Sequence, residues 1–221
     1  MMNNLFMIFE PSSYIKIPLN WISSIMVLMI MPLYFWFMPT RLIMMTWNIK
    51  MFLMKELKMI LKNNNYIIFF ITLFMFIMIN NFMGLFPYIF TSSSHLPMSL
   101  TISLPLWLSL MFFGWINNYN HMFTHLIPQG TPSVLTPFMV LIETISNLIR
   151  PLTLAVRLTA NMIAGHLLMT LMSSLKNSLP NYLLIILILS QIILISLEMS
   201  VAIIQSYVFM ILSSLYSSEI N

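Results

Sequence analysis

The stretch 155-AVRLTANMIAGH-166 places an arginine, Arg157, in the middle of a long apolar segment. A guanidinium group keeps its positive charge throughout the conditions that a protein meets. Burying that charge at membrane depth costs at least about 3 kcal/mol. An arginine in this place therefore predicts a functional site, and it requires a negatively charged partner.

The composition around this arginine is that of a membrane protein. Of the 221 residues, 60% are hydrophobic and 6% are charged, whereas soluble domains carry about 25% charged residues. The apolar runs do not alternate with polar residues, so they predict helices rather than barrel strands. The absence of cysteine excludes disulfides and thiolate metal sites. We expect an all-α polytopic membrane protein with one membrane domain, 1–221.

The start of the chain carries no targeting pattern. Residues 1–11 lack the basic region of a signal peptide and the Arg-rich, Ser-rich pattern of a transit peptide. Methionine is very abundant (24 residues), a bias that suits an AT-rich genome. A very hydrophobic chain with these properties suggests synthesis inside an organelle.

The first half of the chain predicts three spans and one surface helix. The apolar runs 19–38, 66–86 and 98–117 are long enough to cross a membrane. The segment 41–62 has five basic residues and one acidic residue, with lysines at helical spacing, and predicts an amphipathic helix on the membrane surface. The positive-inside rule puts this helix on the matrix side of a mitochondrial membrane, and the N-terminus and the turn 87–97 on the opposite side.

The two last apolar segments are too long for ordinary spans. Residues 181–217 contain neither glycine nor proline, and 137–174 are interrupted only by Pro151. A helix over 181–217 would be about 55 Å long, against a hydrocarbon core of about 30 Å. We therefore expect two long, steeply inclined antiparallel helices, with Pro180 and Asn181 at the turn between them.

Several other polar residues have a structural explanation. Residues 118–136 are polar and rich in Pro, Gly, Thr and His, which predicts a loop or surface segment on the inner side. His121 and His125 have the spacing of metal ligands, but no carboxylate or thiolate accompanies them, so we expect no metal site. Asn80 and Asn81 are expected to form interhelical hydrogen bonds within the second span.

Polar residues line one face of each long helix. Asn161 lies one turn after Arg157 and shares its face, together with small alanines. On the last helix, Gln191, Glu198 and Gln205 recur every seven residues and also share a face. A carboxylate between two amides, in an otherwise apolar helix, indicates a polar path.

Further titratable groups accompany these two faces. His166 follows Arg157 by nine residues, on the opposite face of the helix, and Glu143 precedes it by about 20 Å along the axis. Arg150 shares the Arg157 face one heptad earlier, and the sequence assigns it no role. Glu198 could merely pair with one cation between two helices, but the number of titratable groups favours a proton path.

The sequence resembles subunit a of the F-type ATP synthases, in its mitochondrial form. The resemblance covers most of the chain and is most specific over 143–166, which contains ETISNLIRPLTLAVRL, and over 198–216, EMSVAIIQSYVFMILSSLY. Bacterial members have Glu at the position of His166 and His at the position of Glu198. This chain has the exchanged pair of the mitochondrial form. The resemblance implies a multi-pass protein of the mitochondrial inner membrane.

The resemblance also implies a mechanism and partners. Arg157 matches the essential stator arginine, which faces a carboxylate on a rotor ring of small proteolipid subunits. His166 and Glu198 would relay protons in an outer half-channel, and Glu143 in an inner one. The resemblance also matches Asn161 and Gln205 to the family's asparagine and glutamine near the arginine, and the seven-residue periodicity adds Gln191 to the proton path. The further implied partners are the peripheral stalk, other membrane-sector subunits and lipid, without nucleic acid, cofactor, metal or an ATP site in this chain.

Two other classes of protein compete with this interpretation. A proton-coupled secondary transporter should contain internal repeats and broken helices near the midplane, and no repeat is visible here. A membrane subunit of a quinone oxidoreductase would need a large pocket, which the sequence does not exclude. A purely structural subunit would leave Arg157 and Glu198 unexplained.

Overall fold

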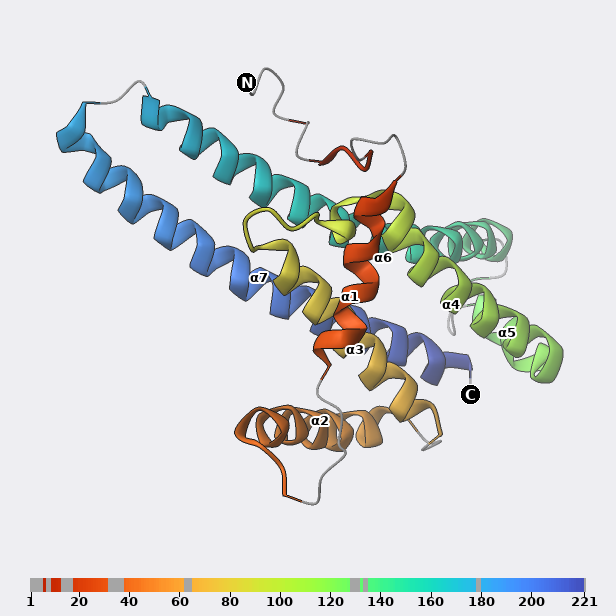
Figure 1. The fold of residues 1–221 in the computed structure, drawn as a ribbon. Helices are drawn as coiled ribbons and strands as arrows, with labels where there is room; N and C mark the ends of the chain where they lie inside the picture. Colours follow the sequence, from red (N-terminus) through yellow and green to blue (C-terminus); the bar gives the residue numbers. More distant parts are fainter. Residues whose placement is uncertain are drawn as a thin grey trace.

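A computed structural model gives the fold of the chain. It describes residues 6, 9–12, 18–31, 38–61, 65–127, 132, 135–177 and 180–220. All regular secondary structure in these ranges is helical, and four of the helices are long and apolar enough to cross a membrane. Figure 1 shows two long C-terminal helices side by side, forming an arm that projects from a group of shorter helices. The expected all-α polytopic architecture is confirmed.

In the apolar run 19–38, the helix ends before Pro32, and the crossing of the membrane by this run stays a prediction. A 3-10 turn, Leu19–Trp21, leads into α1, Ile22–Ile30, which ends where Met31 becomes extended. A proline disfavours helical conformation in the preceding residue, so Pro32 explains the end of the helix. The twelve helical residues reach about 18 Å, short of the hydrocarbon core. Residues 32–37 of the predicted span lie outside the described residues.

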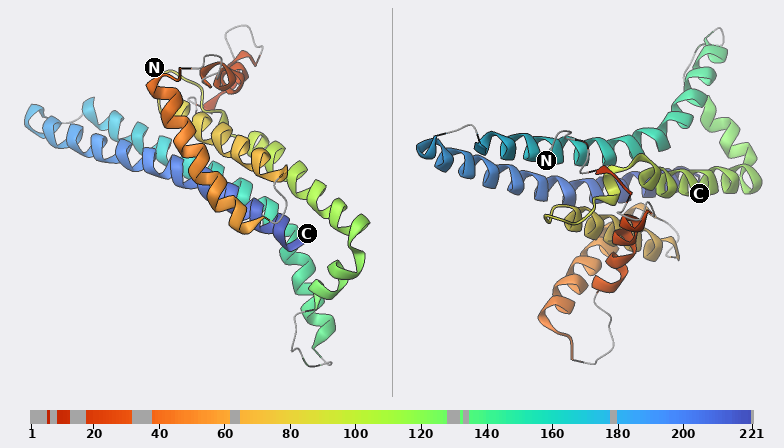
Figure 2. Two further views of the ribbon diagram at one scale, coloured as in Figure 1. Left: turned by 90° about the horizontal axis from the view of Figure 1, so that it is seen from below. Right: turned by 45° about the horizontal axis from the view of Figure 1, so that its top comes forward.

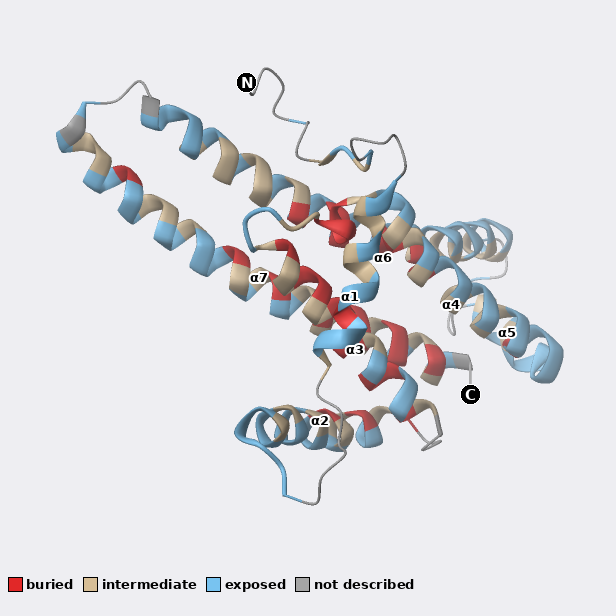
Figure 3. Cartoon of the chain, viewed as in Figure 1, coloured by how far each residue is buried: buried red, intermediate tan, exposed pale blue. Residues whose placement is uncertain are grey.

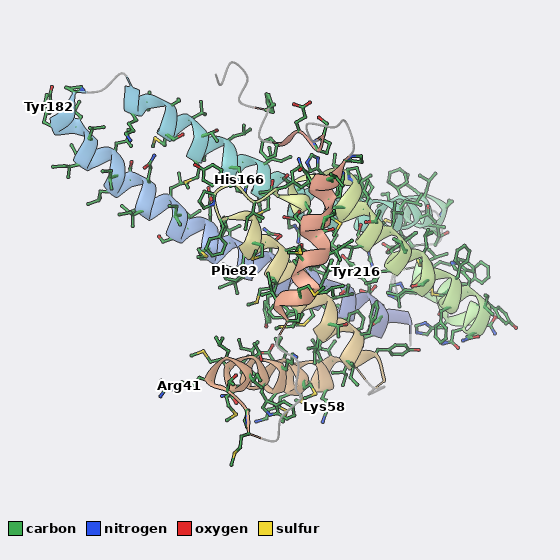
Figure 4. The ribbon with its side chains drawn as sticks, viewed as in Figure 1. Arg41, Lys58, Phe82, His166, Tyr182 and Tyr216 are labelled. Atoms are coloured by element: carbon green, nitrogen blue, oxygen red, sulfur yellow. The ribbon has the colours of Figure 1, made fainter. Side chains whose placement is uncertain are left out.

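The basic segment forms α2, Arg41–Ile60, as predicted. Leu53 and Leu57 on its apolar face are buried against α3, whereas Lys55 and Lys58 are exposed. Figure 4 marks Arg41 and Lys58 toward the two ends of the helix. The helix is therefore amphipathic, and its place on a membrane surface stays a prediction.

The predicted hairpin consists of α3, Asn65–Gly84, and α4, Leu96–Asn117. The turn between them contains a 3-10 helix, Ser92–Ser94, whose three serines are buried. The Ser92 hydroxyl donates a hydrogen bond of 3.5 Å to Asn80 Oδ1, so that asparagine joins its helix to the turn. The amide of Asn81 is fully buried without a hydrogen-bond partner in the described part of the chain.

The segment 118–136, predicted as a loop or surface segment, contains the short helix α5, Tyr119–Leu126, and most of its side chains are exposed. The ring of Phe123 meets the ring of Trp115 edge-on, with the centroids 5.1 Å apart, and this contact holds α5 against the end of α4. Tertiary packing thus stabilises a helix in a polar segment whose composition is typical of a loop.

The two long helices are α6, Thr136–Ser174, and α7, Leu184–Ile220, with 39 and 37 residues. They run antiparallel and in contact, as predicted, and Figures 1 and 2 agree on this arrangement. Tyr182 lies at the tip of the arm, where the chain reverses (Figure 4). Figure 2 also shows that α6 bends in its first half. Pro151 lies inside the helix, where a proline removes a backbone hydrogen bond and causes a kink.

The core lies where α3 crosses α7, close to α2. Figure 3 shows buried residues concentrated there and exposed residues along most of the arm. The Tyr207 hydroxyl donates a hydrogen bond of 3.1 Å to Glu56 Oε2, which links α7 to α2 beside this core. The main buried cluster comprises Leu53, Leu57, Leu61, Ile67, Phe70, Ile71, Phe74, Met75 and Met210.

Candidate functional site

The register between α6 and α7 determines which polar residues meet. A Cβ atom added to Gly165 would lie 2.8 Å from Glu198 Oε1, so this carboxylate lies directly on the α6 backbone. Arg157 and Gln205 line a common groove. Arg157 precedes Gly165 by eight residues and Gln205 follows Glu198 by seven, which is what antiparallel packing requires. The sequence-based faces of the two helices therefore do meet.

Arg157 is exposed at the groove between α6 and α7. In the part of the chain that the structure describes, its guanidinium has no ion-pair or hydrogen-bond partner; the ion pairs found there belong to Arg150. An uncompensated charge at membrane depth is costly. Among the described residues, neither of the two ion pairs involves this arginine. The groove is otherwise lined by Leu154, Leu158, Gln205, Val208 and Phe209.

Small and polar residues extend from Arg157 along the same face of α6. Ala160, Asn161 and Ala164 are all exposed, as the helical spacing predicts. Small side chains let a second helix approach closely. This stripe, Arg157 to Ala164, is open to a helix of another protein.

His166 and Glu198 are brought close together, but no direct hydrogen bond joins them. Glu198 is 8% exposed and contacts Gly165, the chain neighbour of His166. His166 Nε2 and Glu198 Oε1 are both buried without a hydrogen-bond partner among the described residues. The ring of Phe9 lies edge-on to that of His166, with the centroids 6.4 Å apart. A carboxylate and an imidazole in neighbouring positions are suited to exchange a proton.

A second charged cluster lies near the C-terminus of α7. Arg150 Nη2 lies 3.4 Å from Glu143 Oε1, and Arg150 Nη1 lies 2.7 Å from Glu219 Oε2. The guanidinium carbon lies 5.1 Å from the ring centroid of Tyr216. The sequence-based analysis missed Glu219. The available signal was an acidic residue in the last turn of a helix, where the helix dipole disfavours negative charge.

Two further groups were singled out in the sequence: Gln191, and the pair His121 and His125. Gln191 is half-buried, and it lies about 10 Å along α7 from Glu198. The rings of His121 and His125 have centroids 6.4 Å apart. Among the described residues, no group of three His, Asp or Glu side chains could hold a metal ion.

His95, in the α3–α4 turn, belongs to an aromatic cluster. Its ring stacks on Phe90 at 5.0 Å and lies 5.4 Å from Trp21. Burial lowers the pKa of His95 below its ordinary value of 6.5, and a hydrogen bond with the Phe9 backbone opposes that shift. The side chain is therefore mainly neutral at neutral pH, and it packs as an aromatic ring.

Comparisons with known proteins agree with the geometry. The family model described as ATP synthase A chain matches residues 17–218. The chain belongs to this family. Proteins named ATP synthase subunit a are similar to it over the full length of both chains: 58% identical over 226 residues in Anopheles gambiae, 57% over 226 in Aedes aegypti and 55% over 224 in Drosophila melanogaster.

Membership of the ATP synthase A chain family confirms the resemblance seen over 143–166 and 198–216. The chain therefore has the role of an F-type ATP synthase a subunit, and it works in a complex with other subunits. It belongs to the membrane sector of the complex rather than to the site of ATP formation. Its long apolar helices make it a multi-pass protein of the mitochondrial inner membrane. The secondary transporter and the quinone oxidoreductase subunit are no longer needed as alternatives.

Proposed function

We propose that Arg157 is the fixed electrostatic partner of a carboxylate carried by each subunit of a rotor ring. The observation that carries the proposal is the exposed, unpaired guanidinium of Arg157 at the head of the stripe that ends at Ala164. An ionised carboxylate is attracted to this cation and therefore releases its proton. The same cation repels hydronium, so it prevents a direct leak across the membrane.

Two half-channels meet at this arginine. The outer one includes His166 and Glu198, and Gln191 continues it toward the tip of the arm. The inner one includes Glu143. Glu143 and His166 are 23 residues apart on α6, about 35 Å along the helix, with Arg157 between them. A proton thus enters on one side, travels on the ring, and leaves on the other side. The residues that flank Arg157 in this arrangement are Asn161 and Gln205.

The orientation follows from the charge of α2. This basic helix faces the matrix, and the N-terminus and the arm tip face the intermembrane space. The hydrogen bond between Tyr207 and Glu56 supports this assignment, because it brings the C-terminal half of α7 to α2. Glu143 and Glu219 then lie toward the matrix, and His166 and Glu198 toward the intermembrane space.

The partners are the rotor ring, the peripheral stalk, the other membrane-sector subunits and lipid. The surface of the arm supports this proposal, since only 11% of the most apolar window of α7 is buried within the chain. Its exposed side chains are almost all apolar, which suits contact with helices and lipid. The stripe on α6 supplies the small residues that a rotating neighbour requires.

Replacement of Arg157 by glutamine tests the proposal. In inner-membrane vesicles containing the assembled complex, Arg157→Gln should reduce proton-driven ATP synthesis at least about 100-fold, because it removes the electrostatic partner of the ring carboxylate. Arg41→Gln, at the exposed start of α2, is the matched control and should keep near-normal synthesis. Normal synthesis by Arg157→Gln at normal assembly would end the assignment.

A further inference from the structure

Arg150 binds two carboxylates from two different helices, at unequal distances. The contact with Glu219 of α7 is a charge-assisted hydrogen bond of 2.7 Å, whereas Glu143 of α6 lies 3.4 Å away. Short hydrogen bonds between ionised groups are the strongest of their kind. The guanidinium therefore binds Glu219 more strongly than it binds Glu143.

The charges of this cluster do not balance. One guanidinium faces two carboxylates, so one negative charge is left over, and the longer contact shows that it belongs to Glu143. The Tyr216 ring covers the guanidinium carbon at 5.1 Å and adds a favourable contact without a charge. Glu143 is thus the carboxylate in this cluster that lacks a close counter-charge of its own.

Room for solvent lies beside the ion pair. A cavity of about 40 Å³ is lined by Arg150, Glu219, Tyr216, His125 and Asn147. A site of this size with several polar partners is large enough for a water molecule. The α4 side chains at its wall, among them Trp107 and Met111, carry no charge. The charged and titratable groups that line the cavity are Arg150 on α6, Glu219 and Tyr216 on α7, and His125 on α5. Of these, Arg150 contacts Glu143 directly.

A stabilising role alone does not explain Glu219. Its side chain is 40% exposed, and surface ion pairs contribute little to stability. It also lies in the last turn of α7, where the helix dipole disfavours a carboxylate. The contact that Glu219 makes is the hydrogen bond that it accepts from one edge of the Arg150 guanidinium.

We propose that Glu219 is a positioning residue of the inner half-channel: it occupies Arg150 and so prevents Arg150 from neutralising Glu143. Glu143 then exchanges protons with the inner side, next to the cavity that Arg150 and Glu219 line. The inference rests on the role proposed above for Glu143. It also gives Arg150 a role that differs from that of Arg157, because Arg150 has its counter-ions within the chain.

Inverted inner-membrane vesicles, in which the matrix side faces the medium, test this inference. ATP-driven proton pumping would be measured against the pH of the medium and normalised to the amount of assembled complex. In Glu219→Gln, Arg150 turns to Glu143, so pumping at neutral pH should fall several-fold and the pH profile should move to lower pH, because a closer opposite charge favours an ionised carboxylate. Ser218→Ala, next to it on α7, is the control and should leave the profile unchanged.

A second substitution separates positioning from a loss of structure. Arg150→Gln combined with Glu219→Gln removes the cation that captures Glu143, and should restore the wild-type pH profile. The idea is overturned if Glu219→Gln leaves both rate and profile unchanged, or if the double variant is no better than Glu219→Gln. Glu143→Gln, measured alongside, identifies the other failure: if it pumps normally, the proposed role of Glu143 is wrong, whatever Glu219 does.

Discussion

Gly165 lets Glu198 pack directly against the α6 backbone, next to His166 in the chain. A side chain at Gly165 would fill the space that Glu198 Oε1 now occupies. Burying either titratable group alone is costly, and burying them together is much cheaper. The two groups are therefore best tested as a pair.

The exchange of these two residues tests whether they act as a pair. Glu198→Gln should slow proton flow about tenfold or more without abolishing it, because one of two proton-transfer groups remains. His166→Glu combined with Glu198→His should recover part of the flow lost in either single variant, as measured by proton pumping in vesicles. If the two residues act independently, the double variant should pump no better than the worse single variant.

Single residues were predictable where one helix alone sets their position. Arg157, Asn161 and Ala164 follow from helical spacing, and all three are exposed on one face as expected. The partners of Arg150 were not predictable in the same way. Glu219 lies 69 residues further along the chain, and only the packing of α7 on α6 brings it to the guanidinium.

At the scale of elements, α2 is attached to α7 by one polar contact beside the core. Tyr207→Phe keeps the ring and removes the hydroxyl that binds Glu56. A hydrogen bond of this kind contributes about 1 kcal/mol, so local opening of α2 should become about fivefold more frequent. Hydrogen exchange of the α2 amides in the purified complex measures this change. Tyr182→Phe, at the arm tip, should have no effect on α2, and equal exchange in the two variants would contradict the contact.

Helices were predicted correctly where a long apolar run is compatible only with a membrane helix. The helices α3, α4, α6 and α7 agree with the sequence-based ranges to within a few residues. Two details follow from local causes that the sequence-based ranges did not include. Pro32 ends α1 early although the apolar run continues, and the packing of Phe123 on Trp115 stabilises a helix in a polar segment.

At the scale of the whole molecule, the length of α7 determines how the chain lies in the membrane. Its 37 residues form one unbroken helix of about 55 Å, whereas the bend of α6 at Pro151 shortens the straight part of its partner. We expect α7 to stand more than about 45° from the membrane normal, because the hydrocarbon core is about 30 Å thick. An experimental structure of the complex in a lipid bilayer measures this angle. An α7 near the normal would refute the expectation.

Much of the molecular surface is apolar and exposed, and a single chain does not show what covers it. The most apolar windows of α6 and α7 are only 17% and 11% buried, and they form the part of the protein that carries Arg157. The sequence predicts that these helices are apolar, but not which side meets lipid and which meets protein. That distinction depends on chains that the sequence does not encode.

The unpaired guanidinium of Arg157 has a consequence for the life of the protein before assembly. With the role proposed above for Arg157, a newly inserted copy that has no ring beside it would hold a bare cation in hydrocarbon and would draw water and lipid headgroups inward around it. Such a copy is least stable at the moment of its synthesis. Cells that make the chain in excess of the ring should therefore remove the surplus quickly, and the supply of ring subunits should set how much of this chain accumulates.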